Sequence, residues 1–261
     1  MRGRAAPLAV RHAGWTGLCG GLLALLAACS MKSAEQASEE PDARAAIDGV
    51  WRIAQASDRL LTTDGSMPPL LPEPQQVYEQ HIAARHAGDR SWDPASHCRP
   101  LGEPRAMLEL SWPFEVHHSD ERADILYQWN RLDHVIPMAA QHARSAGSSY
   151  FGDSVGRWDG DTLVIDVIHI RADSMLDSSG MPHSGSLHLV ERLRSINDGR
   201  NLEVNLHVSD PETFSSEWNA RLIFDRDPAR IVEDDCVERL QLNEYYTLDN
   251  ALQTEGANRH T

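Results

Sequence analysis

The chain has 261 residues and carries 39 Asp and Glu against 24 Lys and Arg, a formal net charge of −15 at pH 7. This acidic balance argues against a nucleic-acid-binding protein, which needs a basic surface to contact phosphates. It also argues against electrostatic docking on anionic lipid head groups. The length is enough for one large β domain or two small ones.

The N-terminus has the pattern of a secretory signal. Three arginines lie within the first 11 residues, and the apolar stretch that follows is too short for a stable membrane span. The sequence Leu-Ala-Ala-Cys at 26–29 resembles the lipobox of bacterial lipoproteins, in which the cysteine is acylated and becomes the first residue after cleavage. The resemblance implies a signal peptide over 1–28 and a lipid anchor on Cys29, and Ser30 implies the periplasmic face of the outer membrane. An ordinary secreted protein with a chance cysteine at its cleavage site is the alternative.

Three further segments are expected after cleavage. Residues 29–47 are polar and acidic and are predicted to be a lipidated flexible tether. Residues 48–250 are predicted to form a single β-rich domain, and 251–261 a flexible tail. Cleavage removes arginines but no acidic residue, so the mature chain is more negative still, and its attachment to a membrane would depend on acyl chains.

Two cysteines remain for the folded domain. Cys19 leaves with the signal and Cys29 is the lipidation site, which leaves Cys98 and Cys236 in an oxidising compartment. We expect these two to form a disulfide. Neither has a second cysteine at zinc-finger spacing, and the sequence contains no P-loop or dinucleotide-binding glycine pattern, so we expect no metal site and no cofactor.

The domain begins with a short strand and a helix. Gly49–Ile53 is predicted to be the first strand, and a helix is expected from Pro74 to a stop at Gly88. Its packed stripe is expected to contain Val77, Tyr78, Ile82 and Arg85. The rest of the pattern predicts hairpins: 107–119 with 122–130, 153–158 with 161–170, 186–196 with 201–209, and 217–225 with 231–237.

Serial hairpins make an antiparallel meander, which must close or stack in order to hide its edges. The predicted fold is therefore mainly β, a lipocalin-like barrel or sandwich with one short helix after the first strand. Gly49-x-Trp51 resembles the Gly-x-Trp of lipocalins. A larger resemblance, carried by SVGRWDGDTLVID at 154–166 and GMPHSxxLHxxER at 180–192, is to a group of bacterial secreted proteins of uncharacterised function. It implies no chemistry.

Two carboxylates stand in apolar rows of predicted strands. Alternation over 186–196 puts Glu191 on the face of Leu187, Leu189 and Leu193. Desolvation there should raise its pKa and make it a general acid or base. The alternative is a Glu191 satisfied by an arginine or by backbone donors. Asp166 would complete an acid–base pair if the two strands are neighbours.

Two histidines flank a short turn next to these strands. His183 and His188 join Asp166 and Glu191 as candidate catalytic groups, although His183 could simply hydrogen-bond the turn. Residues 188 and 191 point to opposite faces of a strand, which disfavours a shared metal ion.

Four residues are candidates for ligand binding: Trp51, His134, Trp158 and Arg192. The tryptophans are equally compatible with a role in the core. The leading hypothesis is a lipoprotein that binds a small hydrophobic molecule in a barrel pocket and touches the membrane through its lipid anchor. The alternative is a cofactor-free acid–base enzyme, such as an isomerase, hydratase or lyase. The sequence leaves the oligomeric state open.

Overall fold

The computed structural model describes residues 44–55, 57–109, 112–143 and 147–242. The predicted signal peptide, the lipidation site Cys29, most of the predicted tether and the predicted tail lie outside these residues.

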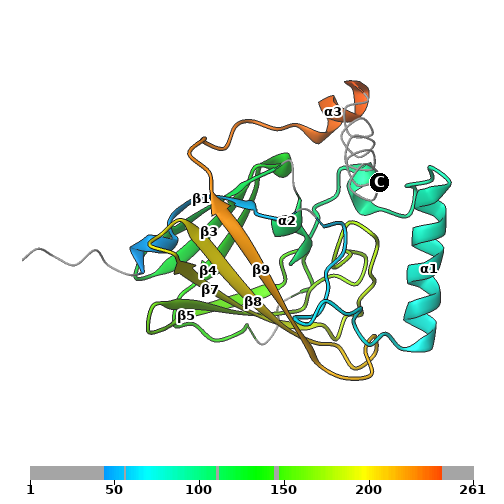
Figure 1. Cartoon of the computed structure of the whole chain (residues 1–261), viewed down its shortest axis with the longest axis horizontal. Coiled ribbons are helices and arrows are strands. Elements are labelled where there is room, and N and C mark those ends of the chain that lie inside the picture. The colour runs from blue at the N-terminus through cyan, green and yellow to red at the C-terminus, as the bar shows by residue number, and fades with distance from the viewer. Residues whose placement is uncertain (1–43, 56, 110–111, 144–146, 243–261) are drawn as a thin grey trace, which may run out of the picture. The chain divides into compact units, whose positions relative to one another are not determined.

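The core of the structure is one sheet of nine strands in the order β4-β3-β2-β1-β9-β8-β7-β6-β5 (Figure 1). Every ladder between neighbouring strands of this order is antiparallel. Two meanders, β1–β4 and β5–β9, are joined where the first strand pairs with the last. The strands are β1 (Gly49–Ile53), β2 (Phe114–His118), β3 (Arg122–Tyr127), β4 (Leu132–Pro137), β5 (Asp153–Asp159), β6 (Thr162–Ile168), β7 (His188–Ile196), β8 (Asn201–Ser209) and β9 (Trp218–Arg226).

The sheet curls until its two edge strands meet, which makes a nearly closed barrel. An odd number of antiparallel strands leaves the first and last strands of the sheet running in the same direction, so β4 and β5 can meet only in parallel. They do so through a parallel bridge between Met138 and Gly156, supported by a 2.8 Å hydrogen bond from the N–H of Ala139 to the carbonyl of Gly156. We call this junction of β4 and β5 the seam. A Cβ atom on Gly156 would lie 2.5 Å from the sulfur of Met138, so glycine permits the close approach.

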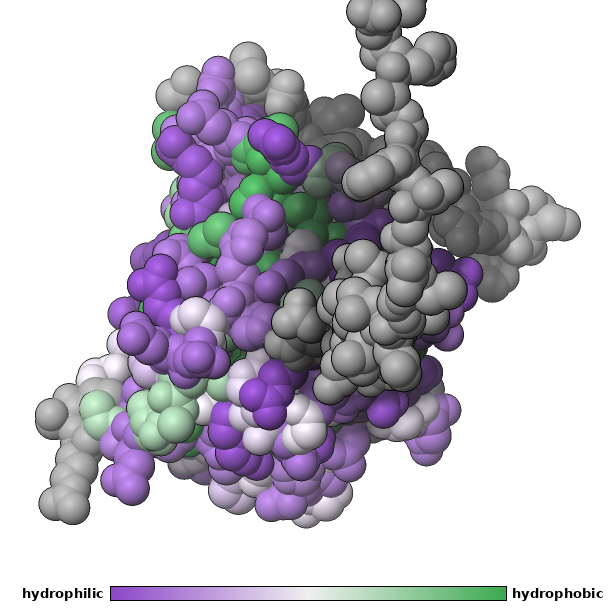
Figure 2. All heavy atoms as spheres, turned by 90° about the vertical axis from the view of Figure 1, so that its left-hand side faces the viewer, coloured by the Kyte–Doolittle hydropathy of each residue, from purple (hydrophilic) through white to green (hydrophobic). Residues whose placement is uncertain are grey.

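The barrel interior is mainly apolar because the strands alternate as the sequence predicted. On β8 the side chains of Leu202, Val204, Leu206 and Val208 are buried, and on β7 the same holds for Leu189, Glu191 and Leu193. Figure 2 shows that the face on the left of Figure 1 is mainly hydrophilic, with hydrophobic side chains gathered in a patch in its upper part. The prediction of a mainly β, antiparallel, barrel-like fold is confirmed, and its shape is compatible with a lipocalin-like fold.

The predicted helix is present as α1 (Pro72–His86) and stands beside the barrel (Figure 1). Tyr78 is buried, and its hydroxyl lies 2.8 Å from the Ser179 hydroxyl. Nδ1 of His81 donates a 2.8 Å hydrogen bond to the carbonyl of Gly180. Val77 is exposed, so its place in the predicted stripe is wrong. The side of the helix that packs against the rest of the protein begins at Tyr78, because the helix lies on the loop around Gly180.

Two segments that were predicted to be strands overlap with short helices instead. The segment 107–119 begins inside α2 (Arg105–Leu108), and the segment 231–237 leads into α3 (Cys236–Leu242). The carboxylate of Asp235 accepts hydrogen bonds from the N–H groups of Val237 and Glu238, which is how a helix N-terminus is capped. Strand β4 was not predicted. Short 3-10 helices form at η1 (Ala45–Ile47), η2 (Pro94–His97) and η3 (Trp129–Arg131).

The predicted disulfide between Cys98 and Cys236 is present, with a Cα–Cα distance of 5.5 Å. It joins the end of η2 to the start of α3. Disulfides persist in oxidising compartments outside the cytoplasm, so the bond suggests such a location. Within the described part of the chain, no helix has the length and apolar character needed to span a membrane.

Candidate functional site

Five polar side chains gather inside the apolar barrel: Glu103, Tyr127, His134, Ser154 and Glu191. We call them the interior cluster. All five are at least nine-tenths buried. They come from the loop before α2, from β3 and β4, and from β5 and β7, so the cluster spans both meanders and the seam between them.

Glu103 is the acceptor at the centre of this cluster. Its Oε1 atom accepts a 2.5 Å hydrogen bond from the hydroxyl of Tyr127 and lies 3.0 Å from Nδ1 of His134. The other ring nitrogen of His134, Nε2, lies 2.8 Å from the hydroxyl oxygen of Ser154. The bond between His134 and Ser154 therefore links the two edge strands of the seam.

Aromatic packing holds this arrangement in place. The ring of Phe151 stacks on Tyr127 at 5.5 Å and on His134 at 5.1 Å between centroids. Burial, followed by the negative charges of Glu103 and Glu191, raises the pKa of Tyr127 well above its ordinary value of 10. Tyr127 therefore stays a hydroxyl and remains a donor to Glu103.

Glu191 differs from the rest of the cluster because it has no hydrogen-bond partner among the described residues. Both of its carboxyl oxygens are buried and have no hydrogen-bond partner among the described residues. Within this part of the chain, the alternative of a Glu191 satisfied by an arginine or by backbone donors is therefore wrong. Burial first, and the nearby charge of Glu103 second, raise the pKa of Glu191 well above its ordinary value. Buried polar groups are nearly always hydrogen-bonded, so an unpaired one calls for an explanation such as a water or a ligand.

The other predicted carboxylate, Asp166, lies on the outside of the barrel. Glu191 pairs with Ile165 across β6 and β7, while Asp166 pairs with Val190. The strands are neighbours, but the two carboxylates point to opposite faces of the sheet. They do not share one site.

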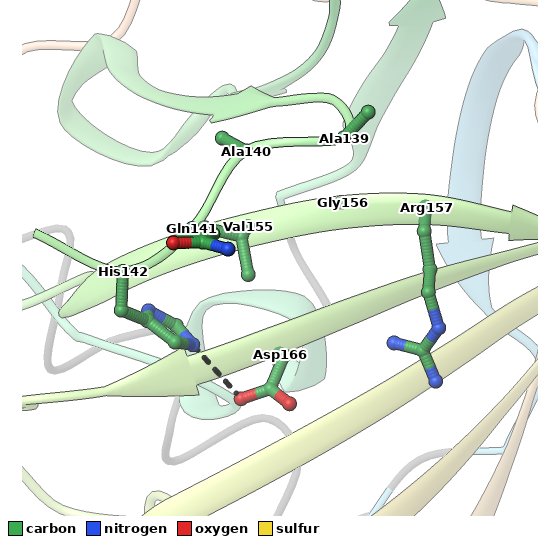
Figure 3. A pocket seen from close by; sticks show the side chains of 8 residues that line it. All are labelled: Ala139, Ala140, Gln141, His142, Val155, Gly156, Arg157 and Asp166. Atoms are coloured by element: carbon green, nitrogen blue, oxygen red, sulfur yellow. Dashed lines mark hydrogen bonds and ion pairs between the residues drawn. The ribbon is translucent and has the colours of Figure 1, made fainter.

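Asp166 instead helps to line an open pocket of about 360 Å³ on the outer side of the seam (Figure 3). The pocket is lined by residues 139–142, residues 155–157 and Asp166. Oδ1 of Asp166 lies 3.1 Å from Nε2 of His142 and 2.8 Å from Nε2 of His188. The predicted neighbours Asp166 and His188 are thus brought together, and His142 from the loop after β4 joins them. We call this the outer pocket.

Both ring nitrogens of His142 face carboxylates, because Nδ1 lies 3.3 Å from Oδ2 of Asp153. Both hydrogen bonds form when both nitrogens carry a proton. No group of three or more His, Cys, Asp or Glu in the described segments is arranged to hold a metal ion.

His183 lies apart from both sites, in the loop between β6 and β7. Its Nδ1 donates to the carbonyl of Ser184 at 2.9 Å, and its Nε2 lies 2.8 Å from the hydroxyl of Ser174. Burial lowers the pKa of His183. Both ring nitrogens are used to hold the loop.

The four predicted ligand-binding residues do not share one site. His134 belongs to the interior cluster. Trp51 is fully buried, and its indole N–H donates to the carbonyl of Ile47 at 2.8 Å. Trp158 packs between Arg44 and His118, and Arg192 forms a largely exposed ion pair of 2.7 Å with Asp159.

No protein-family model matches this chain, and no curated protein matches it. Its function therefore has to be argued from its own side chains.

Sequence reasoning missed Glu103, Tyr127 and Ser154 as members of a site. Tyr127 could have been found, because the alternation of Ala123, Ile125 and Tyr127 on β3 puts its hydroxyl inside the barrel. Glu103 and Ser154 gave no such signal. Glu103 stands in a loop, and Ser154 becomes an inner residue of the seam only once β4 and β5 are placed together.

Proposed function

We propose that the barrel binds a small, mainly apolar molecule whose polar group hydrogen-bonds to Glu191. The observation that supports this function is the buried, unpaired carboxyl group of Glu191 inside a mainly apolar barrel. Ligand sites of this kind are lined mainly by hydrophobic side chains, with a few polar groups that orient the ligand.

The raised pKa of Glu191 defines the matching chemistry of the ligand. A neutral carboxyl group can donate its O–H to a carbonyl or ether oxygen, and its other oxygen can accept from a hydroxyl or an amine. A ligand carrying a fixed negative charge would be disfavoured next to Glu103 and Glu191. The proposed ligand is therefore a neutral hydrophobic molecule with one hydrogen-bonding group.

The test uses two fluorescent probes of nearly equal size, 1-aminoanthracene and anthracene, titrated into the full-length protein. The first carries an amine that can donate to Glu191, and the second has no polar group. We expect saturable one-to-one binding of both. Glu191→Leu should lower the affinity for 1-aminoanthracene by about tenfold, which corresponds to the loss of one hydrogen bond of about 1.4 kcal/mol. The affinity for anthracene should stay unchanged.

Glu217→Leu makes the same chemical change at an exposed site on the barrel surface and is the matched control. It should leave the binding of both probes unchanged. Absence of saturable binding, or equal losses for the two probes in Glu191→Leu, would contradict the proposal.

We further propose that the protein acts at the periplasmic face of the outer membrane, attached through a lipid on Cys29. The basic and apolar leader, the lipobox-like cysteine and the disulfide of the folded domain support this location.

A second candidate function is acid–base catalysis on the bound molecule. It is favoured by the raised pKa of Glu191 and by the nearby hydroxyl of Tyr127. The proton would move to or from Glu191 alone, since Asp166, His183 and His188 lie elsewhere. Glu191→Gln separates the two functions, because it keeps a hydrogen-bonding group but cannot take up a proton. Unchanged binding with lost turnover indicates the enzyme.

A further inference from the structure

We infer that Ser154, His134 and Glu103 form a nucleophile–base–acid relay that hydrolyses a small carboxylic ester at the seam of the barrel. This activity goes beyond the proposed binding function and needs neither Glu191 nor an apolar ligand.

The three side chains stand in the order that nucleophilic catalysis by serine requires. The Ser154 hydroxyl oxygen lies 2.8 Å from Nε2 of His134, and Nδ1 of the same ring lies 3.0 Å from Oε1 of Glu103. Both distances fall within the range for a nucleophile and its base, and for a base and the group that orients it. The order is recognised by geometry and not by sequence position, and these residues lie far apart in the sequence.

The hydrogen-bond partners of Glu103 fix the direction of the relay. Tyr127 donates its hydroxyl to Oε1, the same oxygen that faces His134, so this oxygen is an acceptor. In the neutral ring, Nδ1 then carries the hydrogen and donates to Glu103, while Nε2 accepts from Ser154 at 2.8 Å. The carbonyl of Phe151, at 3.1 Å, is the competing acceptor for the single proton of the Ser154 hydroxyl. The stacked ring of Phe151 holds the imidazole in this orientation.

Burial increases from the nucleophile inward. Ser154 is 7% exposed, His134 3% and Glu103 0%. All three groups are thus buried in the nearly closed barrel.

The chemistry balances with water as the only co-reactant. The Ser154 oxygen attacks the carbonyl carbon of the ester while its proton passes to Nε2 of His134. The bond from the carbonyl carbon to the alkoxy group breaks, and His134 returns the proton to the departing alcohol. Water then attacks the acyl–serine with the same assistance, which releases the carboxylic acid and restores Ser154.

The seam supplies the approach for the substrate. The two edge strands meet at the bridge between Met138 and Gly156, and the outer pocket opens on the outside of this junction (Figure 3). Its wall includes Val155 and Gly156, the residues directly after Ser154. Because Ser154 itself faces the barrel interior, hydrolysis requires the strands to part between this bridge and the His134–Ser154 bond, so that an ester seated in the outer pocket reaches the hydroxyl.

The experiment treats the full-length protein with a fluorophosphonate probe, which forms a covalent bond with activated serines. The labelled residue is then located by mass spectrometry of the peptides. We expect labelling at Ser154, none at position 154 in Ser154→Ala, and labelling slower by a factor of about 10² to 10⁴ in His134→Gln, the usual contribution of a general base. Ser209→Ala removes a surface hydroxyl and should label like the wild type.

Circular dichroism and an intact disulfide serve to show that each variant is folded. No labelling of Ser154 in the folded wild type would overturn the inference, and so would an unchanged labelling rate in folded His134→Gln. In either case the network serves only to join the two edges of the seam. Binding of 1-aminoanthracene is measured separately on the wild type, so failure of the relay and failure of the binding function are distinguishable.

Discussion

Two glutamates of neighbouring strands show how the face of a sheet decides the chemistry of a residue. Glu191 points into the barrel, and burial raises its pKa. Glu203 on β8 points outward. Partial burial also opposes its ionisation, but hydrogen bonds from Arg221 and Arg194 outweigh this and lower its pKa. Glu191 therefore favours the neutral form and Glu203 the ionised form.

This contrast predicts how stability depends on pH. The pKa of Glu191 is higher in the folded state than the ordinary value of 4.5, so its contribution to stability is fully present below pH 4.5 and is lost as the pH rises toward the folded pKa. As the pH rises over this range, the free energy of unfolding of the wild type should fall by up to about 1.4 kcal/mol per pH unit relative to that of Glu191→Leu. Urea unfolding of both proteins at a series of pH values between 4 and 8 measures the difference.

At pH 8 the Glu191→Leu variant should be the more stable of the two by about 1–3 kcal/mol, because an unpaired buried group has been removed. Glu203→Gln is the control of opposite sign and should lose stability at the same pH, since it gives up ionic hydrogen bonds. Parallel pH curves for the wild type and Glu191→Leu would show that Glu191 has a partner after all.

Among the elements, α3 depends most on a few specific contacts. It is joined to η2 by the disulfide between Cys98 and Cys236. The Arg239 guanidinium binds the buried carboxylate of Asp234, which also accepts the N–H of Asn130 next to β4. A helix of seven residues is not stable in isolation, so these contacts hold it.

Loss of the disulfide should therefore release α3 and lower the free energy of unfolding by about 2–5 kcal/mol. The comparison is between the wild type and the double variant Cys98→Ser with Cys236→Ser, by urea unfolding and by limited proteolysis, with new cleavage expected after residue 230. A reductant should shift the wild-type midpoint and leave that of the double variant in place. Equal midpoints without reductant would contradict this role.

The elements also show what sequence could and could not predict. The long hairpins of β5 to β8 were predictable because turn residues and two-residue alternation agree there. β4 was missed because hydrophobicity does not follow its two faces: apolar Val135 is exposed on the outside, and polar His134 is buried on the inside. The helix α3 was missed because a cap at Asp235 outweighs the β-branched residues before it. The interior cluster could not be predicted as a whole, since it depends on the meeting of β4 with β5.

At the scale of the whole molecule, the proposed lipid attachment through Cys29 predicts in which cell fraction the barrel is found. Replacement of Cys29 by Ser should leave the folded barrel unchanged but move it from the membrane to the soluble fraction. Fractionation and intact mass measure both effects. A variant that still loses residues 1–28 and remains bound to the membrane would contradict lipid attachment through Cys29.

The pairing of β1 with β9 has a consequence for the order of events during synthesis. Trp51 lies opposite Arg226, so one side of the first strand has no partner until almost the whole described chain has been made. Contacts between such distant residues form late and slowly. A chain emerging from a ribosome can therefore build hairpins but cannot complete the ring until its last strand has been made.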